Sequence, residues 1–282
     1  MATVVRALFP DFATTSALPF LQEAIDWGRS LRPEWFQQVY NMKSTDRAHE
    51  QFTSYTKFGL FAETGEGSQV TYDTPIQGFD KTLTPLQYSL GFRTSKIAFD
   101  DDKTGPIRSL AEGLGQSWTE TRNIITADHF NNGFNSAFAG PDGLPLFDTA
   151  HLREDGISFR NEMAASADFS VTSFRTAQID FANFRDGRGK RRQLSPVSIM
   201  SAPDNFHNIA EVIRSTDRPD TGNRATNVQQ GYFGGAPLNQ ITNHYLTDAD
   251  AWFLIAEKAE HGLIMLEREP FNVQTDVEFN TR

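Results

Sequence analysis

Cysteine is absent from the 282 residues of the sequence, so the chain holds neither a disulfide nor a thiolate metal site. Long apolar runs are absent too, since no window approaches the roughly 18 apolar residues of a membrane span. Residues 1–19 also lack the basic start and the small-residue cleavage site of an export signal. We therefore expect no membrane insertion and no export, and the cytoplasm is a suitable place for the chain to fold.

Positive charge is scarce. The 26 Lys and Arg residues are outnumbered by 36 Asp and Glu residues, which gives a formal net charge of -10. Extensive binding to nucleic acid depends on many Lys and Arg side chains that neutralise phosphates. The composition therefore allows only local and weak contact with DNA.

Sequence signatures of catalysis are missing as well. The glycine-rich segments that begin at Gly65 and Gly113 lack the third glycine of a nucleotide loop, and no GxSxG or HExxH motif occurs. The Asp100–Asp102 run lacks the spacing of a calcium loop. None of the histidines forms an i, i+4 pair: His49, His129, His151, His207, His244 and His261. The sequence predicts no catalytic residue, no cofactor and no metal site.

Aromatic residues are plentiful, with 24 Phe in a chain that is 38% apolar, so the chain has ample material for a core. Its length suits one large domain or two closely packed ones. The spacing of apolar residues predicts a helix over 16–31. Residues 33–57 carry aromatics without a steady period, which indicates an extended arm.

Alternation with a period of two, interrupted by Gly and Pro, predicts a long β-hairpin within residues 58–97. Two strands alone are marginally stable in water, so we expect the hairpin to lie on a neighbouring copy of the chain. The side chains expected to make that contact are Phe58, Val70, Tyr72, Phe79, Tyr88 and Phe92.

The pattern then changes to a helical period, and a long helix is predicted over 104–134, with Thr104 as its cap. Gly113 and Gly115 in that helix indicate either close packing, a bend or a solvent-facing turn. A loop at 139–152, helices at 171–184, 204–214 (capped by Asp204) and 248–261, and strands at 196–201, 238–246 and 271–279 complete the pattern. The predicted class is α+β.

One basic cluster stands out, comprising Arg185, Arg188, Lys190, Arg191 and Arg192. It is expected either to contact DNA or an acidic partner, or to form a solvated loop tip. The acidity of the whole chain limits the first alternative to weak phosphate contact.

The order of these elements resembles the Mu-like major head subunit family of tailed-phage capsid proteins. The segments ETGEGSQVTYDTPIQGFDKTLTPLQYSLGFRTSK, GPDGLPLFDTAHL and YLTDADAWFLIA carry the resemblance, which extends from residue 58 to residue 282. Members of the family usually continue with a further strand where this sequence ends.

The resemblance implies the tailed-phage major capsid fold. Residues 1–57 would be an N-terminal arm and 58–97 an extended hairpin loop. Residues 98–169 and 267–282 would form a peripheral domain with a long spine helix, and 170–266 an axial domain. The subunit would assemble with itself as pentamers and hexamers in the host cytoplasm, enclose double-stranded DNA, and meet scaffolding, portal and cement proteins.

Two other functions are compatible with the sequence. An encapsulin-like shell has the same fold but holds protein cargo. A soluble α+β enzyme would use Asp148 and His151 as its acid and base, although three-residue spacing in a Gly/Pro loop favours turn hydrogen bonds.

Overall fold

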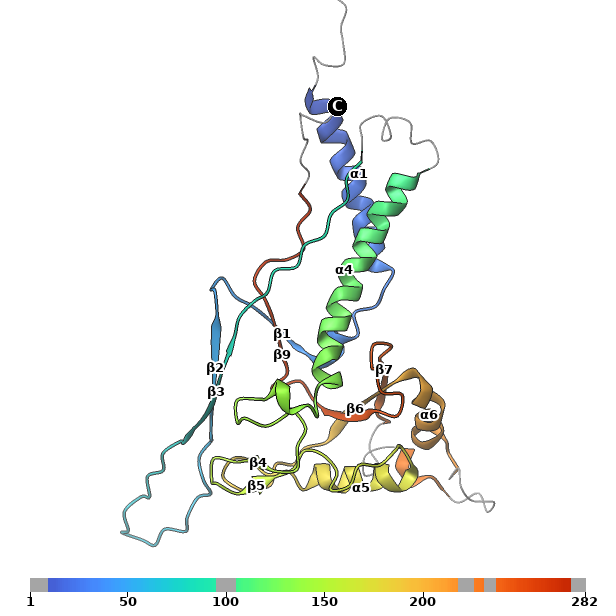
Figure 1. The fold of residues 1–282 in the computed structure, drawn as a ribbon. Helices are drawn as coiled ribbons and strands as arrows, with labels where there is room; N and C mark the ends of the chain where they lie inside the picture. Colours follow the sequence, from blue (N-terminus) through green and yellow to red (C-terminus); the bar gives the residue numbers. More distant parts are fainter. Residues whose placement is uncertain (1–9, 95–104, 218–225, 231–236, 275–282) are drawn as a thin grey trace, which may run out of the picture. The chain divides into compact units, whose positions relative to one another are not determined.

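The computed structural model describes residues 10–94, 105–217, 226–230 and 237–274, with the side chains of the first helix from Phe20 onward (Figure 1). The chain divides into two compact units. The first unit comprises Met1–Glu34, Leu86–Ile125 and Glu267–Arg282, and the second comprises Trp35–Pro85 and Thr126–Leu266. The predicted cap Thr104 and most of the predicted strand at 271–279 lie outside the described residues.

The helices confirm much of the sequence prediction. Two of them are long, and both contribute to the first unit. The α-helices of the described residues are α1 (Pro10–Ser30), α2 (Phe36–Val39), α4 (Pro106–Asn131), α5 (Val171–Ala182) and α6 (Phe206–Arg214). No helix among the described residues combines the length and the apolar content needed to cross a bilayer.

The strands are short. Three of them form a mixed sheet, and the others pair in twos. They are β1 (Asn41–Ser44), β2 (Glu50–Tyr55), β3 (Gln77–Leu83), β4 (His151–Leu152), β5 (Ser158–Phe159), β6 (Pro196–Ser201), β7 (Asn239–Thr242), β8 (Trp252–Ala256) and β9 (Ile264–Glu267).

In the first unit, α1 crosses α4 at two glycines. A Cβ atom added at Gly28 would lie 2.0 Å from the carbonyl oxygen of Glu112, and one added at Gly115 would lie 2.1 Å from the carbonyl oxygen of Ile25. Only glycine permits so close an approach of two backbones. A Cβ atom added at Gly113 would have nothing within 4 Å, so close packing explains Gly115 but not Gly113.

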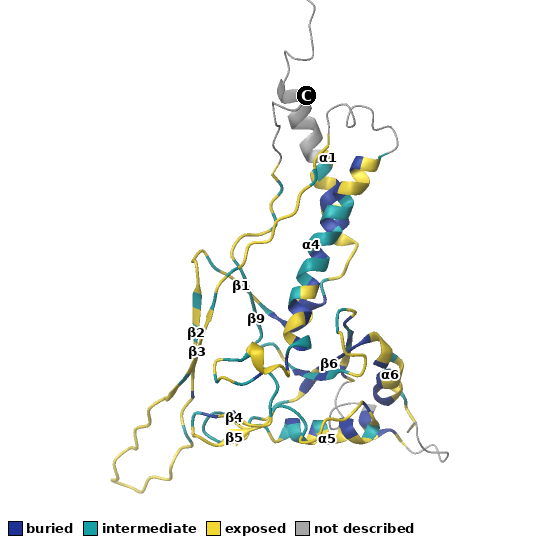
Figure 2. Cartoon of the chain, in the orientation of Figure 1, coloured by how far each residue is buried: buried dark blue, intermediate teal, exposed yellow. Residues whose placement is uncertain are grey.

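The core of the first unit lies along this crossing. Ala24, Ile25 and Ala111 are buried between the helices, and Phe92 and Phe271 pack against them. The burial colours of Figure 2 show the buried side of α4. Phe92 therefore belongs to a helical core, which corrects its predicted place in the hairpin.

The second unit is built around the sheet β7-β6-β8, in which β6 pairs parallel with β7 and antiparallel with β8. The predicted strand 196–201 is confirmed as β6. Met200 and Ile199 are fully buried in two separate core clusters of this unit. Every residue of β6 is buried except Val197, so both faces of the strand contribute to a core.

The predicted helix at 248–261 is wrong, because Trp252–Ala256 forms β8 beside β6. Asp248 and Gly262 resemble helix boundaries, but the aromatic and β-branched residues between them suit a strand. Burial alternates along β8, with Phe253 and Ile255 in the core. Tertiary pairing with β6 therefore overrides the local helix signal.

The predicted arm is also corrected in part. Trp35, Phe36, Val39 and Tyr40 are buried in the main core cluster of the second unit, and the Tyr40 hydroxyl donates to the carbonyl oxygen of Thr126 at 2.8 Å. These four residues form or flank a single helical turn, α2, which is too short to give the segment a steady period.

The hairpin exists, but its strands differ from the predicted ones. β2, which lies in the predicted arm, pairs antiparallel with β3, so that Glu50 faces Leu83 and Tyr55 faces Gln77. The segments around Tyr72 and Tyr88 alternate in sequence without forming strands. A segment of residues 56–76 joins the two strands and is called the β2–β3 loop below.

The cap predicted for α6 is wrong as well. Asp204 lies in a 3₁₀ turn, Pro203–Asn205, and the residue before the helix is Asn205, whose side chain makes no capping bond. By contrast, Ser170 caps α5 in a reciprocal arrangement with Ser173.

Candidate functional site

The β2–β3 loop exposes large apolar side chains along most of its length (Figure 2). Tyr72 is 93% exposed and Phe61 is fully exposed. The sequence pattern missed Leu60 and Phe61, although the run FGLF at 58–61 is a local signal for them. The exposed apolar residues of the loop are Phe58, Leu60, Phe61, Val70, Tyr72 and Ile76.

The remaining predicted contact residues lie elsewhere. Phe79 is on β3 and Tyr88 is in the segment that begins the second part of the first unit; both are partly exposed. Phe92 packs against the helices of that unit. The structure thus places Phe58, Val70 and Tyr72 on one loop and Phe79 on β3, whereas Tyr88 and Phe92 belong to the other unit.

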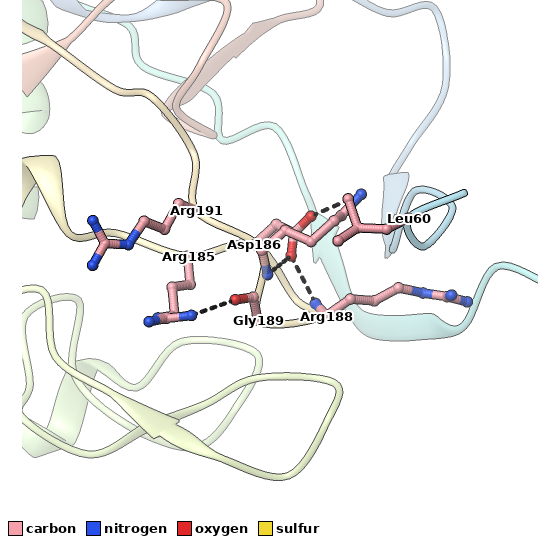
Figure 3. Close-up of a pocket in the computed structure, with 7 residues that line it drawn as sticks. Leu60, Arg185, Asp186, Arg188, Gly189 and Arg191 are labelled. Atoms are coloured by element: carbon pink, nitrogen blue, oxygen red, sulfur yellow. Dashed lines mark hydrogen bonds and ion pairs between the residues drawn. The ribbon is translucent and has the colours of Figure 1, made fainter. Parts of the chain in front are cut away.

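The basic cluster forms a turn whose centre is Asp186. The Asp186 carboxylate accepts hydrogen bonds from the amides of Arg188 (3.0 Å) and Lys190 (2.8 Å), and Gly189 adopts a φ of 77° (Figure 3). Burial raises the pKa of Asp186, but these two amides and the Lys190 charge outweigh it, and the pKa lies below its usual value. The turn is therefore held as an ionised, well-bonded unit.

Arg188 extends from this turn to the β2–β3 loop. Its Nε donates to Thr56 Oγ1 at 3.2 Å, its Nη1 to Asp73 Oδ2 at 2.5 Å, and its Nη2 to the carbonyl oxygen of Thr74. Thr56 begins the loop, whereas Asp73 and Thr74 lie near its end. One guanidinium thus bonds to both arms of the loop.

Further bonds tie the same place together. Lys190 Nζ donates to the carbonyl oxygen of Phe58 at 2.5 Å. The Gly59 amide donates to Asp73 Oδ2 at 2.6 Å, and Thr56 and Ile76 exchange hydrogen bonds of 2.8 and 2.9 Å across the loop. The base of the loop is consequently a bonded network, while the rest of the loop is open to solvent.

The other cations of the cluster point elsewhere. Arg192 forms an ion pair with Glu260, and Arg185 donates to the carbonyl oxygen of Gly189 at 2.8 Å. Arg191 is exposed and points away from Arg188 in Figure 3. Four of the five residues, all but Arg192, line an open hollow. Arg188, Lys190 and Arg192 each pair with a carboxylate of the chain.

The proposed acid and base of an enzyme do not form a pair. Asp148 accepts a hydrogen bond from the Ala150 amide at 2.8 Å, as expected for a turn. His151 Nδ1 lies 2.5 Å from a different carboxylate, that of Asp142. Within the described ranges, no three His, Asp or Glu side chains gather as metal ligands would.

A family model described as phage capsid protein matches residues 80–282. The chain belongs to the phage capsid protein family. As a structural capsid protein of a tailed phage, it is part of the virion. The family match favours a phage head over the encapsulin-like shell, and both family and fold point to a structural protein. The Mu-like subdivision stays a prediction.

Solved structures similar to this capsid protein include two states of the bacteriophage JBD30 shell. Its procapsid aligns with a TM-score of 0.60 and 12% identity over 86% of this chain and 100% of that chain. Its capsid aligns with a TM-score of 0.61 and 11% identity over 77% and 92% of the two chains.

A third structure, the JBD30 capsid decorated with minor capsid protein trimers, aligns with a TM-score of 0.55 and 12% identity over 75% of this chain and 90% of that chain. No match was found among curated proteins. The similarity to the three JBD30 structures confirms the predicted tailed-phage capsid fold.

Proposed function

We propose that copies of this capsid protein assemble into a closed icosahedral shell around double-stranded DNA, and that the β2–β3 loop binds an adjacent subunit. The exposure of Phe58, Leu60, Phe61 and Tyr72 on one loop carries the proposal. A contiguous set of exposed apolar side chains marks an interaction surface, because leaving it in water costs free energy that association recovers.

The free energy recovered at each contact contributes to assembly. Fully burying one Leu or Phe side chain is worth about 1.5–3 kcal/mol. Burying two or three of them at each contact therefore supplies several kcal/mol per subunit. A closed symmetric shell repeats the contact on every subunit, so moderate interfaces are enough to hold it.

The family and the fold support this partner over others. The similar JBD30 structures are a procapsid and capsids, one of them bearing minor capsid protein trimers. We infer that this chain likewise forms fivefold and sixfold groups, in the host cytoplasm, through residues 170–266, with 98–169 and 267–282 at the periphery. Scaffolding, portal and cement proteins are further partners in this proposal.

The test replaces apolar loop residues in the full chain. Leu60→Ser with Phe61→Ser should leave the subunit folded, because both side chains are exposed, but should abolish most large particles in negative-stain images and size fractionation. The matched control, Leu60→Met with Phe61→Leu, keeps the apolar surface and should assemble normally. Serine variants that assemble as well as the unmodified chain would exclude the loop as the contact.

A further inference from the structure

Beyond its base, the β2–β3 loop makes few contacts that could fix its direction. Residues 57–77 are exposed except for the half-buried Gly59, and none of the loop residues after Thr56 belongs to a core cluster of the described residues. Ordering such a segment costs about 1–2 kcal/mol per residue in backbone entropy alone. Its direction must therefore be determined where it joins the folded unit.

At that junction, Arg188 is the residue that bridges the two arms. Its guanidinium reaches Thr56 on the outgoing arm and Asp73 and Thr74 on the returning arm. The planar fork of arginine matches several acceptors at fixed angles, which a lysine ammonium does not. Three bonds from one side chain therefore restrict rotation of the loop and not only its distance from the unit.

Arg188 is itself held in place. Its side chain is only 17% exposed, and its amide donates to Asp186. On the other side of the turn, the Asp155 amide donates to the carbonyl oxygen of Gly187 at 3.2 Å. The Glu154 carboxylate lies beside Gly187 in the same turn. The backbone that carries the guanidinium is thus held in place by hydrogen bonds on both sides.

We propose that Arg188, assisted by Lys190, is a positioning residue that fixes the direction of the β2–β3 loop and so makes the subunit competent to form closed shells. The basic turn is an internal anchor in this view. The effect on shells rests on the proposed function of the loop, whereas the effect on the loop itself is a property of the subunit alone.

The experiment measures amide hydrogen exchange by mass spectrometry in the full chain, unassembled. In the peptides that cover residues 56–76, Arg188→Ala should speed exchange of the bonded amides at the loop base, those of Thr56, Gly59 and Ile76, by about tenfold, as expected when charge-assisted bonds are removed. Arg191→Ala is the matched control, because it removes the same charge from the same turn without a contact to the loop. Unchanged exchange in Arg188→Ala would overturn the anchor.

Two further measurements distinguish the loss of the anchor from misfolding of the subunit and from the loss of a positive charge. Protection of the β6 peptide, 196–201, should be the same in every variant, which shows that the sheet is intact. Arg188→Lys keeps the charge but not the fork, and should give intermediate exchange in the loop. Full protection in Arg188→Lys would overturn the two-arm bridge.

The same preparations are then imaged after assembly. When assembly is carried out without DNA, Arg188→Ala should yield fewer closed shells and more open or irregular particles, and Arg191→Ala should yield normal shells. Normal shells from a variant whose loop exchanges faster would overturn the link to assembly but leave the anchor standing. Failure of the proposed function gives a different result, since the Leu60 and Phe61 serine variants would then assemble as well.

Discussion

Asp73 makes the base of the β2–β3 loop sensitive to acid. The Arg188 guanidinium, foremost, and the Gly59 amide lower the pKa of Asp73 from 3.8 to about 2. Because this pKa is lower in the folded chain than in the unfolded chain, ionised Asp73 stabilises the fold fully above about pH 4. The contribution is lost as the pH falls through about 2.

Asp73→Asn tests this expectation, since the amide keeps an oxygen for Gly59 but not the charge. At neutral pH the variant should unfold at a lower urea concentration than the unmodified chain. The gap between the two midpoints should stay constant down to about pH 5 and close as the pH approaches 2. A gap that persists unchanged at the lowest pH would contradict the role of the charge.

The sequence identified the basic cluster but not what it does inside the chain. Arg188 and its partners Thr56 and Asp73 are 132 and 115 residues apart, so no local pattern connects them. The turn hydrogen bond of Asp148 was predictable, because its donor, the Ala150 amide, is only two residues away in the sequence. Short-range chemistry was predictable, and long-range pairing was not.

Helix α4 offers a matched pair of glycines on which the α1–α4 crossing can be tested. Gly113→Ala has open space and should stabilise the helix by up to about 1 kcal/mol, the propensity difference between the two residues. Gly115→Ala would place a methyl group 2.1 Å from the Ile25 carbonyl oxygen, so it should destabilise by about 1–3 kcal/mol as an overpacked site.

Urea unfolding followed by circular dichroism measures both variants against the unmodified chain. Opposite signs are the expected result. Equal effects of the two substitutions would show that helix propensity alone governs both positions and that the crossing with α1 is not close.

Elements with one strong period were predictable and those with conflicting signals were not. The predicted strand 196–201 is β6, and the predicted helices over 104–134 and 171–184 are α4 and α5, because sheet burial and helical spacing were both clear. The segment WFLIA lay between two plausible helix boundaries, so only its pairing with β6 decided for a strand. Likewise, β3 finds its partner in β2, which the absence of a period had placed in an arm.

In the assembled particle, two cations of the basic cluster are candidates for contact with DNA. The chain carries a net charge of -10, and Arg188, Lys190 and Arg192 each pair with a carboxylate of the subunit, whereas Arg185 and Arg191 form no ion pair among the described residues. Removing those three would disturb the fold and obscure any effect on DNA. We therefore propose Arg185 and Arg191 as the residues of the cluster that contact packaged DNA weakly.

Binding of the full chain to double-stranded DNA at several salt concentrations tests this proposal. The slope of log K against log salt is negative, and each lost phosphate contact reduces its magnitude by about 0.9. Arg185→Ala with Arg191→Ala should therefore lower it by up to about 1.8, while Arg175→Ala, an exposed arginine on α5, should leave it unchanged. An unaltered slope in the double variant would show that these two arginines do not bind DNA.

The two units are interleaved along the chain, and this order has a consequence for synthesis. The first unit draws on three separate stretches, the last of which begins at Glu267, and in the second unit the Asn41 amide donates to the carbonyl oxygen of Leu263. Synthesis must therefore pass Leu263 before the second unit can close its contacts, and must reach the stretch that begins at Glu267 before the first unit can. We therefore expect nascent chains that lack these stretches not to join a growing particle.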